Sequence, residues 1–411
     1  MAEIIEVNLA SPEFKCDPER ILGPLRADHP VARIAVPDGE TAWLITRWKD
    51  ANAVFKDPRF RKDERSVLSA EEIARTCSSL EEELMMRHLS KTDPPEHTRL
   101  RACFAPLFAP HRVEGWREDV QAIVNDTIAQ FPRSGPVDLV PSFASHIPSL
   151  AVCRLLLRSS HYQPLMIEYA NHITARDIGP VTDDVKQSIK DLLVLVKELI
   201  QEIRARPEEG LLGDWLSTED SEGPLTTEEI LAMVSIIIRA GVAATEGLLA
   251  NGVLLLLQHP DQMDLLREEP DLADSAIDEM LRYRPPSTLT TPRWVHEDLK
   301  MHGHTLRRGD MVLVSVVAAN HDPAVFPHPE RFDIRRRDNH HLGFGKGIHY
   351  CLGASLGRLE GKTAFPTLLN SFPRMRLACP LEQVPWTPGM KIAVPQSLPV
   401  ELDRPVACSL T

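Results

Sequence analysis

One long apolar segment, TTEEILAMVSIIIRAGVAATEGLLANGVLLLL, occupies residues 226–257 and is interrupted only by glycines. Thr226 followed by Glu229 is typical of a capping box, in which the two side chains satisfy free N–H groups at the start of a helix. At 1.5 Å per residue the predicted helix is about 48 Å long, enough to cross the whole molecule. Because Arg239 and Glu246 lie inside it, we expect a buried core helix and not a membrane span.

The rest of the chain is mostly helical in pattern, with a smaller β-forming part. Apolar and polar residues alternate over 30–36 and 41–46, which predicts a β-hairpin. Residues 94–258 have mostly helical spacing, and no linker or repeat divides the chain. We therefore predict one mainly α-helical (α+β) domain over residues 1–411, with β-rich parts near residues 30–60 and 285–320.

Charge and cysteine usage exclude several classes of protein. The formal net charge of −13 argues against non-specific binding to nucleic acid or to an anionic membrane surface. The first residues lack the basic start and apolar stretch of a secretory signal. The seven cysteines are scattered without a repeated spacing, which is typical of a reducing compartment. We expect a cytoplasmic protein with no nucleic-acid partner and no membrane partner.

A lone cysteine follows three alternating glycines in HLGFGKGIHYCLGASLGRLE, residues 341–360. The glycine spacing fits neither a phosphate loop nor a dinucleotide turn. A zinc site could use the nearby histidines, but no paired cysteines support it. A core cysteine is the ordinary interpretation of a lone cysteine, yet it does not explain glycines that cost chain entropy.

Ligation of haem iron by Cys351 is the fourth interpretation, and it explains the most features. Glycines let a backbone pass close to a flat macrocycle. A cysteine at the start of a helix faces free N–H groups and the positive end of the helix dipole, which lower the pKa of its thiol. Gly353 lets the chain turn into that helix.

With these residues in view, the whole chain resembles the cytochrome P-450 superfamily, in particular its soluble bacterial members. The haem-binding signature of the family is matched by Phe344, Gly345, Gly347, His349, Cys351 and Gly353. The resemblance implies a helical bundle with a long central helix over the haem and small β-sheets. It also implies haem b as the cofactor and Cys351 as the metal ligand.

Charged motifs of the family occur in the same order along the chain. EMLR and PERFD supply Glu279, Arg282 and Arg331, which resemble the family's structural ion cluster. The resemblance implies four ligands of the haem propionates: His97, Arg101, Arg293 and His349. These four could instead be ordinary surface groups, but as ligands they would form charge-assisted hydrogen bonds to two carboxylates.

The long helix departs from the family pattern where the family places its proton-supplying groups. Ala240 and Gly241 match the family's small pair, whereas Ala243 and Ala244 occupy the positions of the acid and the alcohol. Thr245 comes one residue late, and one residue turns a helix by about 100°. We expect the catalytic positions of the helix at Ala240, Gly241, Ala243, Ala244 and Thr245.

Three functions stay open at this point. The resemblance implies a haem-thiolate monooxygenase that hydroxylates or epoxidises a medium-sized natural product in bacterial secondary metabolism. The missing acid and alcohol also fit oxidative coupling or ring closure without oxygen insertion. A haem-based binding or sensing protein is the alternative from a different class.

The resemblance also implies where the substrate and the electron donor bind. The pocket should be formed by the loop over residues 66–86 and by Ile236, Arg239, Val242, Thr288, Leu289 and Ile392. Arg239 either holds a polar group of the substrate or pairs with an acid elsewhere, because an unpaired buried charge is costly. The chain has no flavin or nicotinamide domain, so we expect a ferredoxin and a ferredoxin reductase to supply its electrons. We also expect a monomer. A basic face for that ferredoxin would comprise Arg112, Arg117, Arg335, Arg336, Arg337, Lys346 and Arg358.

Overall fold

The computed structural model describes residues 3–36, 39–69, 71, 87–132, 134–157, 164–166, 168, 183–207, 209–220 and 223–403. Most of the loop that was expected to line a pocket, residues 66–86, lies outside these ranges.

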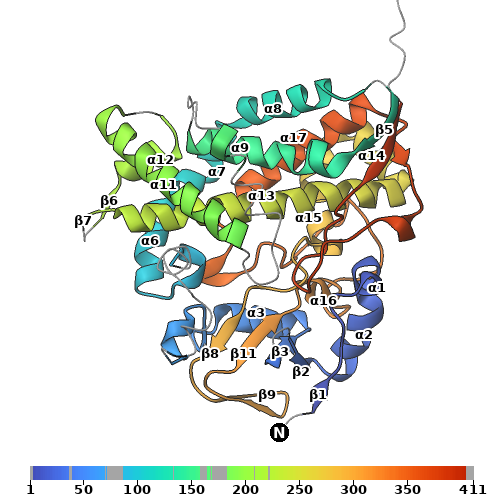
Figure 1. Cartoon of the computed structure of the whole chain (residues 1–411). Coiled ribbons are helices and arrows are strands. Elements are labelled where there is room, and N and C mark those ends of the chain that lie inside the picture. The colour runs from blue at the N-terminus through green and yellow to red at the C-terminus, as the bar shows by residue number, and fades with distance from the viewer. Residues whose placement is uncertain are drawn as a thin grey trace, which may run out of the picture.

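The predicted long helix is present as α13, Thr227–Gln258, which runs through the middle of the molecule (Figure 1). Thr226 forms the predicted capping box. Its Oγ1 accepts from the Glu229 N–H at 3.2 Å, and its own N–H donates to Glu229 Oε2 at 2.8 Å. Among the described residues α13 is the one helix apolar and long enough to cross a membrane, yet 67% of its most apolar window is buried. It is therefore a core helix, as predicted.

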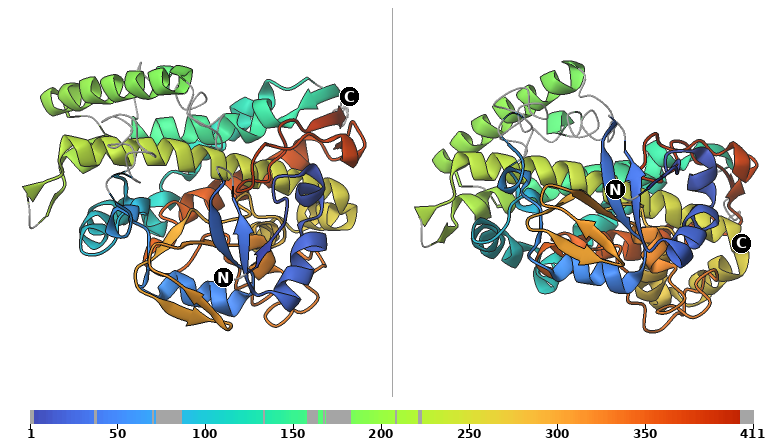
Figure 2. Two further views of the ribbon diagram at one scale, coloured as in Figure 1. Left: turned by 60° about the horizontal axis from the view of Figure 1, so that its bottom comes forward. Right: turned by 90° about the horizontal axis from the view of Figure 1, so that it is seen from below.

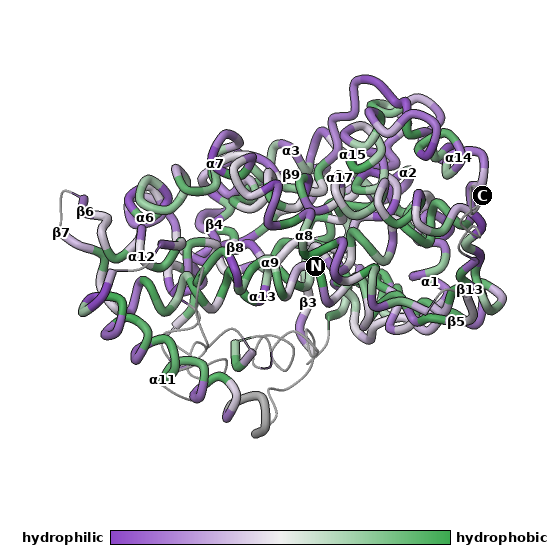
Figure 3. Tube along the Cα trace, turned by 90° about the horizontal axis from the view of Figure 1, so that it is seen from above, coloured by the Kyte–Doolittle hydropathy of each residue, from purple (hydrophilic) through white to green (hydrophobic). Residues whose placement is uncertain are grey.

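Helices surround α13 on several sides and share one large apolar core with it (Figures 1 and 2). The helices in contact with it are α9 (His146–Leu156), α11 (Asp183–Ala205), α14 (Pro260–Glu268), α15 (Ala273–Tyr283) and α17 (Ala354–Ser371). A further helix, α8 (Arg117–Ala129), packs on α9 and α17. Apolar and polar turns alternate along α11 (Figure 3), as expected for a helix with one face on the core.

Gly252 lies where α13 and α17 approach each other closely. A Cβ atom at this position would lie 2.7 Å from Phe365 Cε1 and 2.8 Å from Met280 Sδ. We expect Gly252→Ala to lower the free energy of unfolding by about 1–3 kcal/mol, because buried side chains must move to admit the methyl group. Thermal unfolding measures the loss. In Gly23→Ala the new Cβ meets only the flexible end of Glu19, so an equal loss in that control would contradict the packing explanation.

The shorter helices connect the core to the sheets and to the loops. They are α1 (Pro12–Cys16), α2 (Pro18–Asp28), α3 (Trp48–Lys56), α6 (Glu96–Phe104), α7 (Pro110–Glu114), α12 (Leu211–Leu216) and α16 (Val316–Asn320). One π-helical turn, Val140–Ala144, precedes α9 and packs on α13.

The main sheet lies below α13 in Figure 1 and has the strand order β1-β2-β3-β11-β8-β4. Its strands are β1 (Ile4–Ile5), β2 (Val31–Ala35), β3 (Thr41–Ile45), β4 (Phe60–Arg61), β8 (Arg293–Val295) and β11 (Met311–Val314). The predicted hairpin is the antiparallel pair β2 and β3, with Val31 opposite Ile45. Side chains alternate between the two faces of β3: Trp43 packs with α3, whereas Leu44 packs with α1 and α2.

Among the described residues, three small sheets accompany the main sheet. They are β9 (Leu299–Met301) with β10 (His304–Leu306), β6 (Glu219–Asp220) with β7 (Gly223–Pro224), and β12 (Arg376–Leu377) with β13 (Pro399–Asp403) and β5 (Ser134–Asp138). The pairing of β13 with β5 joins the end of the chain to its middle, with Val400 opposite Val137. No local pattern in the sequence predicted that pairing.

Candidate functional site

A cavity of about 270 Å³ lies between α13, α17 and the loop that ends at Cys351. On α13 it is lined by apolar and small residues, including Ile236, Ala240, Gly241 and Ala244. Ala240 and Ala244 are exposed although they lie in a core helix, because their surface faces this cavity. The small pair predicted in the sequence therefore widens the space beside the cysteine loop.

The cysteine loop is shaped by its glycines. Gly345 and Gly347 have φ angles of +66° and +73°, a region that L-residues rarely adopt. A Cβ atom on Gly347 would lie 2.5 Å from the Phe55 carbonyl oxygen of α3. The Cys351 N–H donates to the Phe344 carbonyl at 2.9 Å, which closes the loop. The loop therefore presents Cys351 to the cavity, and α17 begins three residues later at Ala354.

Burial raises the pKa of the Cys351 thiol, whereas the Gly353 N–H group, Arg101 and Arg358 act in the opposite direction. The start of the helix therefore lowers the pKa of the thiol, as the sequence suggested, but by less than burial raises it. A thiolate in this position needs a further positive partner, which a bound metal ion supplies.

The zinc interpretation finds no geometric support. The rings of His349 and His97 are tilted by 56° with their centroids 4.3 Å apart, and His341 Nε2 lies 3.2 Å from Asp278 Oδ1. Among the described residues no group of three or more histidine, cysteine, aspartate or glutamate side chains is arranged to hold a metal ion. Cys351 is thus a thiol on the cavity wall that belongs to no group of three or more metal-binding side chains among the described residues.

Imidazole and guanidinium groups gather beside the cavity, and the carboxylate of Asp93 acts on two of them, His97 and Arg293. His97 Nε2, His349 Nε2 and Arg293 Nε are buried and have no hydrogen-bond partner within the described part of the chain. Burial lowers the pKa of His349 to about 2. Arg101 lines the same cavity, and its Nη2 donates to the Tyr350 carbonyl at 2.9 Å. Buried donors without acceptors are costly, so this set fits a ligand that carries carboxylates.

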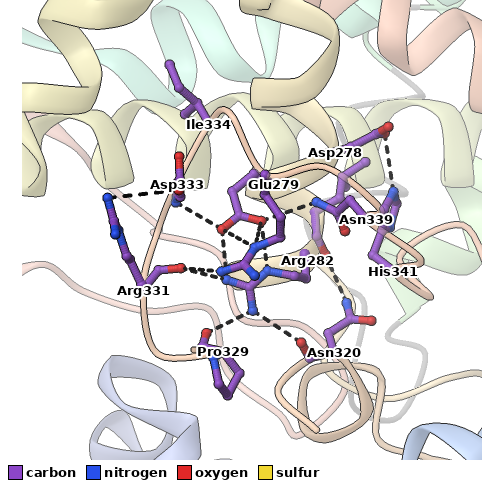
Figure 4. Close-up of polar contacts among 12 residues, drawn as sticks. Asp278, Glu279, Arg282, Asn320, Pro329, Arg331, Asp333, Ile334, Asn339 and His341 are labelled. Atoms are coloured by element: carbon purple, nitrogen blue, oxygen red, sulfur yellow. Dashed lines mark hydrogen bonds and ion pairs between the residues drawn. The ribbon is translucent and has the colours of Figure 1, made fainter. Parts of the chain in front are cut away.

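Glu279 and Arg282 of α15 form a completely buried ion pair, with Nε–Oε2 2.7 Å and Nη2–Oε1 2.8 Å apart (Figure 4). Arg282 also donates to the carbonyls of Asn320 and Pro329. Asn320 Oδ1 in turn accepts from the Leu342 N–H at 2.7 Å. The pair therefore fixes the segment that leads into the cysteine loop.

The structure corrects the third member of this cluster. Arg331 contributes its backbone carbonyl to Arg282, while its side chain is 70% exposed and lies 4.0 Å from Asp333. The third guanidinium is that of Arg336, whose Nε lies 3.0 Å from Glu279 Oε2. The reason is the turn at Asp333, whose N–H donates to Glu279 Oε1 and which brings the later arginine back to the carboxylate.

Thr245 makes a contact that the sequence did not reveal. It lines the cavity together with Glu360 of α17, and its hydroxyl opposes the rise that burial causes in the pKa of the Glu360 carboxyl group. Glu360 is only 1% exposed, and its Oε1 has no partner among the described residues. No local motif marks Glu360, because its neighbours in GRLEGK resemble those of any helix.

Several residues predicted for the substrate pocket are not among the described residues that line the cavity. Ile236 lines the cavity, whereas Val242 is fully buried, and Ala243, half-buried, is not part of the lining. Thr288 and Leu289 are buried behind Ser287, which does line it; Ile392 pairs with Ser287 through a β-bridge. Their role in a pocket stays a prediction, since most of residues 66–86, which were predicted to complete the pocket, lies outside the described ranges.

Arg239 is half-buried and forms no ion pair with another described residue. A titratable group close to it is His88, whose pKa is lowered to about 3, mainly by burial and then by the charge of Arg239. An acidic partner elsewhere in the fold, the ordinary explanation for this arginine, is therefore not found among the described residues.

Most cations of the expected basic face have partners. Arg117 pairs with Glu114 and Arg335 with Glu269. Arg358 pairs with Asp278 at 2.9 Å, and Lys346 lies over the Trp48 ring at 4.6 Å. Arg336 belongs to the buried cluster, so a basic docking surface here is smaller than the sequence suggested.

Comparisons with known proteins give consistent matches. A family model described as Cytochrome P-450 matches residues 150–398. The polyketide biosynthesis cytochrome P-450 PksS of Bacillus subtilis (strain 168) is 32% identical over 395 residues, which cover 95% of this chain and 97% of that protein. The cytochrome P-450 monooxygenase PikC of Streptomyces venezuelae is 36% identical over 409 residues, covering 98% and 95%. The solved structure of PksS has a TM-score of 0.90 at 30% identity and covers 97% of this chain and 100% of that chain.

Proposed function

Because this chain belongs to the cytochrome P-450 family of monooxygenases, we propose that it inserts oxygen into a medium-sized, mostly apolar natural product. The observation that carries the proposal is the cavity itself, in which Cys351 faces the small residues Ala240 and Gly241. The relatives' names support the substrate class, since PksS is named for polyketide biosynthesis and PikC as a monooxygenase.

The residues present fit a haem, which we propose to be haem b. Cys351 would hold the iron, and Arg101, Arg293, His97 and His349 would hold the two propionates, since three of these four have buried nitrogen atoms without partners. When bound, the haem supplies the chemistry that activates dioxygen. The chain's own residues fix the cysteine loop, keep water out with apolar walls and hold the carboxylates of the cofactor.

Arg293 gives a direct test of this cofactor site. We expect Arg293→Leu to bind haem at least about 10-fold more weakly, because a buried charge-assisted hydrogen bond to a carboxylate is lost. The haem content of the purified protein, and its loss to an excess of apomyoglobin, measure the change. Arg59→Leu is the control, because Arg59 pairs with Asp57 on the surface. Equal haem retention in wild type and Arg293→Leu would contradict the assignment.

For electron supply we propose a ferredoxin and its reductase as partners. The support is the exposure of the loop that leads to Cys351. Lys346 and Ile348 of that loop lie close to solvent, and Ile348 is 49% exposed. Arg112 and Arg337 are the other charged residues of the expected face for which we find no ion pair among the described residues.

Oxidative coupling or ring closure is the second candidate function. It is favoured by one observation, the alanines at positions 243 and 244 where the family has an acid and an alcohol. In that case the substrate would lose two hydrogen atoms and gain no oxygen.

The experiment that tests the proposed function is turnover with a surrogate ferredoxin and its reductase. The purified haem protein is offered macrolide and linear polyketide substrates, and products are identified by mass. A product heavier by one oxygen atom, formed only with reductase and dioxygen present, is the expected result. Tight binding of carbon monoxide and dioxygen without any turnover would instead favour a binding or sensing protein.

A further inference from the structure

Arg239 of α13 lies beside the cavity and has no counter-ion among the described residues. Ile236, three residues before it, and Ala240, the residue after it, both line the cavity. Positions three residues apart on a helix differ by about 60° in direction, so Arg239 lies next to the lining face of α13. It is half-buried, and it forms no hydrogen bond or ion pair with another described residue.

A short segment, residues 88–91, reaches the same part of the cavity. Leu89 and Ser90 line the cavity, and the Oγ of Ser90 lies 2.9 Å from Nδ1 of His88, which is 4% exposed. The charge of Arg239 acts on the His88 ring, so the guanidinium is close to this segment. Because burial lowers the pKa of His88 to about 3, the ring is uncharged at neutral pH and supplies no charge of its own.

Three cations act on His88, and among the described residues Arg239 is the one that nothing balances. Lys91 pairs with Glu64, with Nζ 3.9 Å from Oε1. Lys62 is 6% exposed and donates to two backbone carbonyls at 2.9 and 3.3 Å. No carboxylate is among the described groups that act on His88. This part of the cavity therefore has an excess of positive charge, and the excess is at Arg239.

We propose that Arg239 binds a carboxylate group of the substrate, so that the substrates are carboxylic acids with an apolar body. The guanidinium fork matches the two oxygens of a carboxylate and forms charge-assisted hydrogen bonds to them. A phosphate brings up to about two negative charges to a single cation, and a neutral carbonyl leaves the charge of Arg239 unmatched. The inference rests on the proposed function, because it names the class of molecule that is oxidised.

The lining next to Arg239 suits the rest of such a molecule. Leu89, Ile236 and Ile237 present hydrocarbon side chains to the cavity, and Ala240 leaves space beside them. Apolar walls with one charged group give a site that fixes one end of a ligand and excludes water from the remainder. The carboxylate would therefore set which end of the substrate stays at Arg239.

The first test measures binding without turnover. Linear saturated acids from hexanoic to dodecanoic acid, and the methyl ester of each, are titrated into the purified haem protein by calorimetry. The ester keeps the apolar body and removes the negative charge. We expect the wild type to bind acids at least about 10-fold more tightly than their esters, because only the acid forms the charge-assisted hydrogen bonds. Equal affinity for acid and ester throughout the series would overturn the proposal.

Variants of Arg239 assign that preference to one side chain. Arg239→Leu should bind acids about as weakly as esters, whereas Arg239→Lys should keep part of the preference, because lysine retains the charge without the fork. Arg33→Leu is the matched control: Arg33 is also half-buried, but it lies on β2, bonds to Thr41 and does not line the cavity. A preference for acids that persists in Arg239→Leu, or that is lost equally in Arg33→Leu, would overturn the proposal.

Thermal unfolding without ligand separates substrate binding from a structural ion pair. Arg239→Leu should unfold at the wild-type temperature or above it, because the change removes a half-buried charge that has no anion. If Arg239 paired with an acid of the chain, the variant would unfold at a lower temperature and its affinity for carboxylic acids would equal that of the wild type. That pair of results would overturn the proposal.

Turnover with a surrogate ferredoxin and its reductase separates this inference from the proposed function. We expect Arg239→Leu to raise the KM for the acids at least about 10-fold and to give a broader mixture of products, because one end of the substrate is no longer held. Oxidation of neutral compounds by a wild type without any preference for acids would overturn this inference and leave the proposed function standing. Preferential binding of acids without oxidation of any compound would support the carboxylate site and contradict the proposed function.

Discussion

Replacing Cys351 by serine is expected to abolish oxidation while leaving a folded protein. The thiol is the group that the loop presents to the cavity, and a serine hydroxyl cannot supply a thiolate to iron. We expect activity to fall by more than about 100-fold, since even residues that only support a metal ligand cost 10–100-fold. The reduced carbon monoxide complex of the variant should also lose the red-shifted Soret band that thiolate ligation gives.

Cys379→Ser is the matched control for this prediction. Cys379 is also a free, partly exposed cysteine, but it follows β12 and does not line the cavity. It should retain the wild-type spectrum and activity. A wild-type spectrum in Cys351→Ser would show that another group binds the iron, and the account of the site would be wrong.

The second large effect is expected at Glu279. Glu279→Gln keeps the shape of the side chain but leaves the buried guanidinium of Arg282, and that of Arg336, without their carboxylate. Removing one partner of a buried ion pair costs about 3–5 kcal/mol. We expect a loss of this size in chemical unfolding, together with weaker haem retention, because Arg282 and Asn320 fix the segment before the cysteine loop.

Variants of Arg336 and Arg331 test which of these two arginines is the third charged member of that cluster. Arg336→Ala should cost several kcal/mol, because its guanidinium is 10% exposed and bonded to Glu279. Arg331→Ala should change stability by less than about 0.5 kcal/mol, because its side chain is 70% exposed. The reverse order of the two losses would restore the assignment that the sequence suggested.

The parts of the fold that were predictable depend on local signals. The capping box at Thr226 and an uninterrupted apolar run fixed both ends of α13 to within two residues. Alternation of side chains predicted the hairpin of β2 and β3. By contrast, β13 pairs with β5 across most of the chain, and only tertiary packing brings such strands together.

The site shows the same division between local and distant contacts. The glycines before Cys351 are a local requirement of the turn, so they mark the loop in the sequence. Glu360, which lines the cavity together with Thr245, lies on another helix, and the third cation of the ion cluster depends on how the chain turns at Asp333. These contacts depend on the relative positions of α13, α15 and α17, which no short stretch of sequence records. The predicted single domain and the substrate pocket stay predictions.

The most direct test of the central claim is the mass of the product formed under isotopically labelled dioxygen. The haem protein, a surrogate ferredoxin and its reductase are incubated under labelled dioxygen with a natural product that the enzyme converts. The same incubation under unlabelled dioxygen serves as the control. We predict one labelled oxygen atom in the product. A product that has lost two hydrogen atoms and carries no label would contradict oxygen insertion and establish oxidative coupling or ring closure instead.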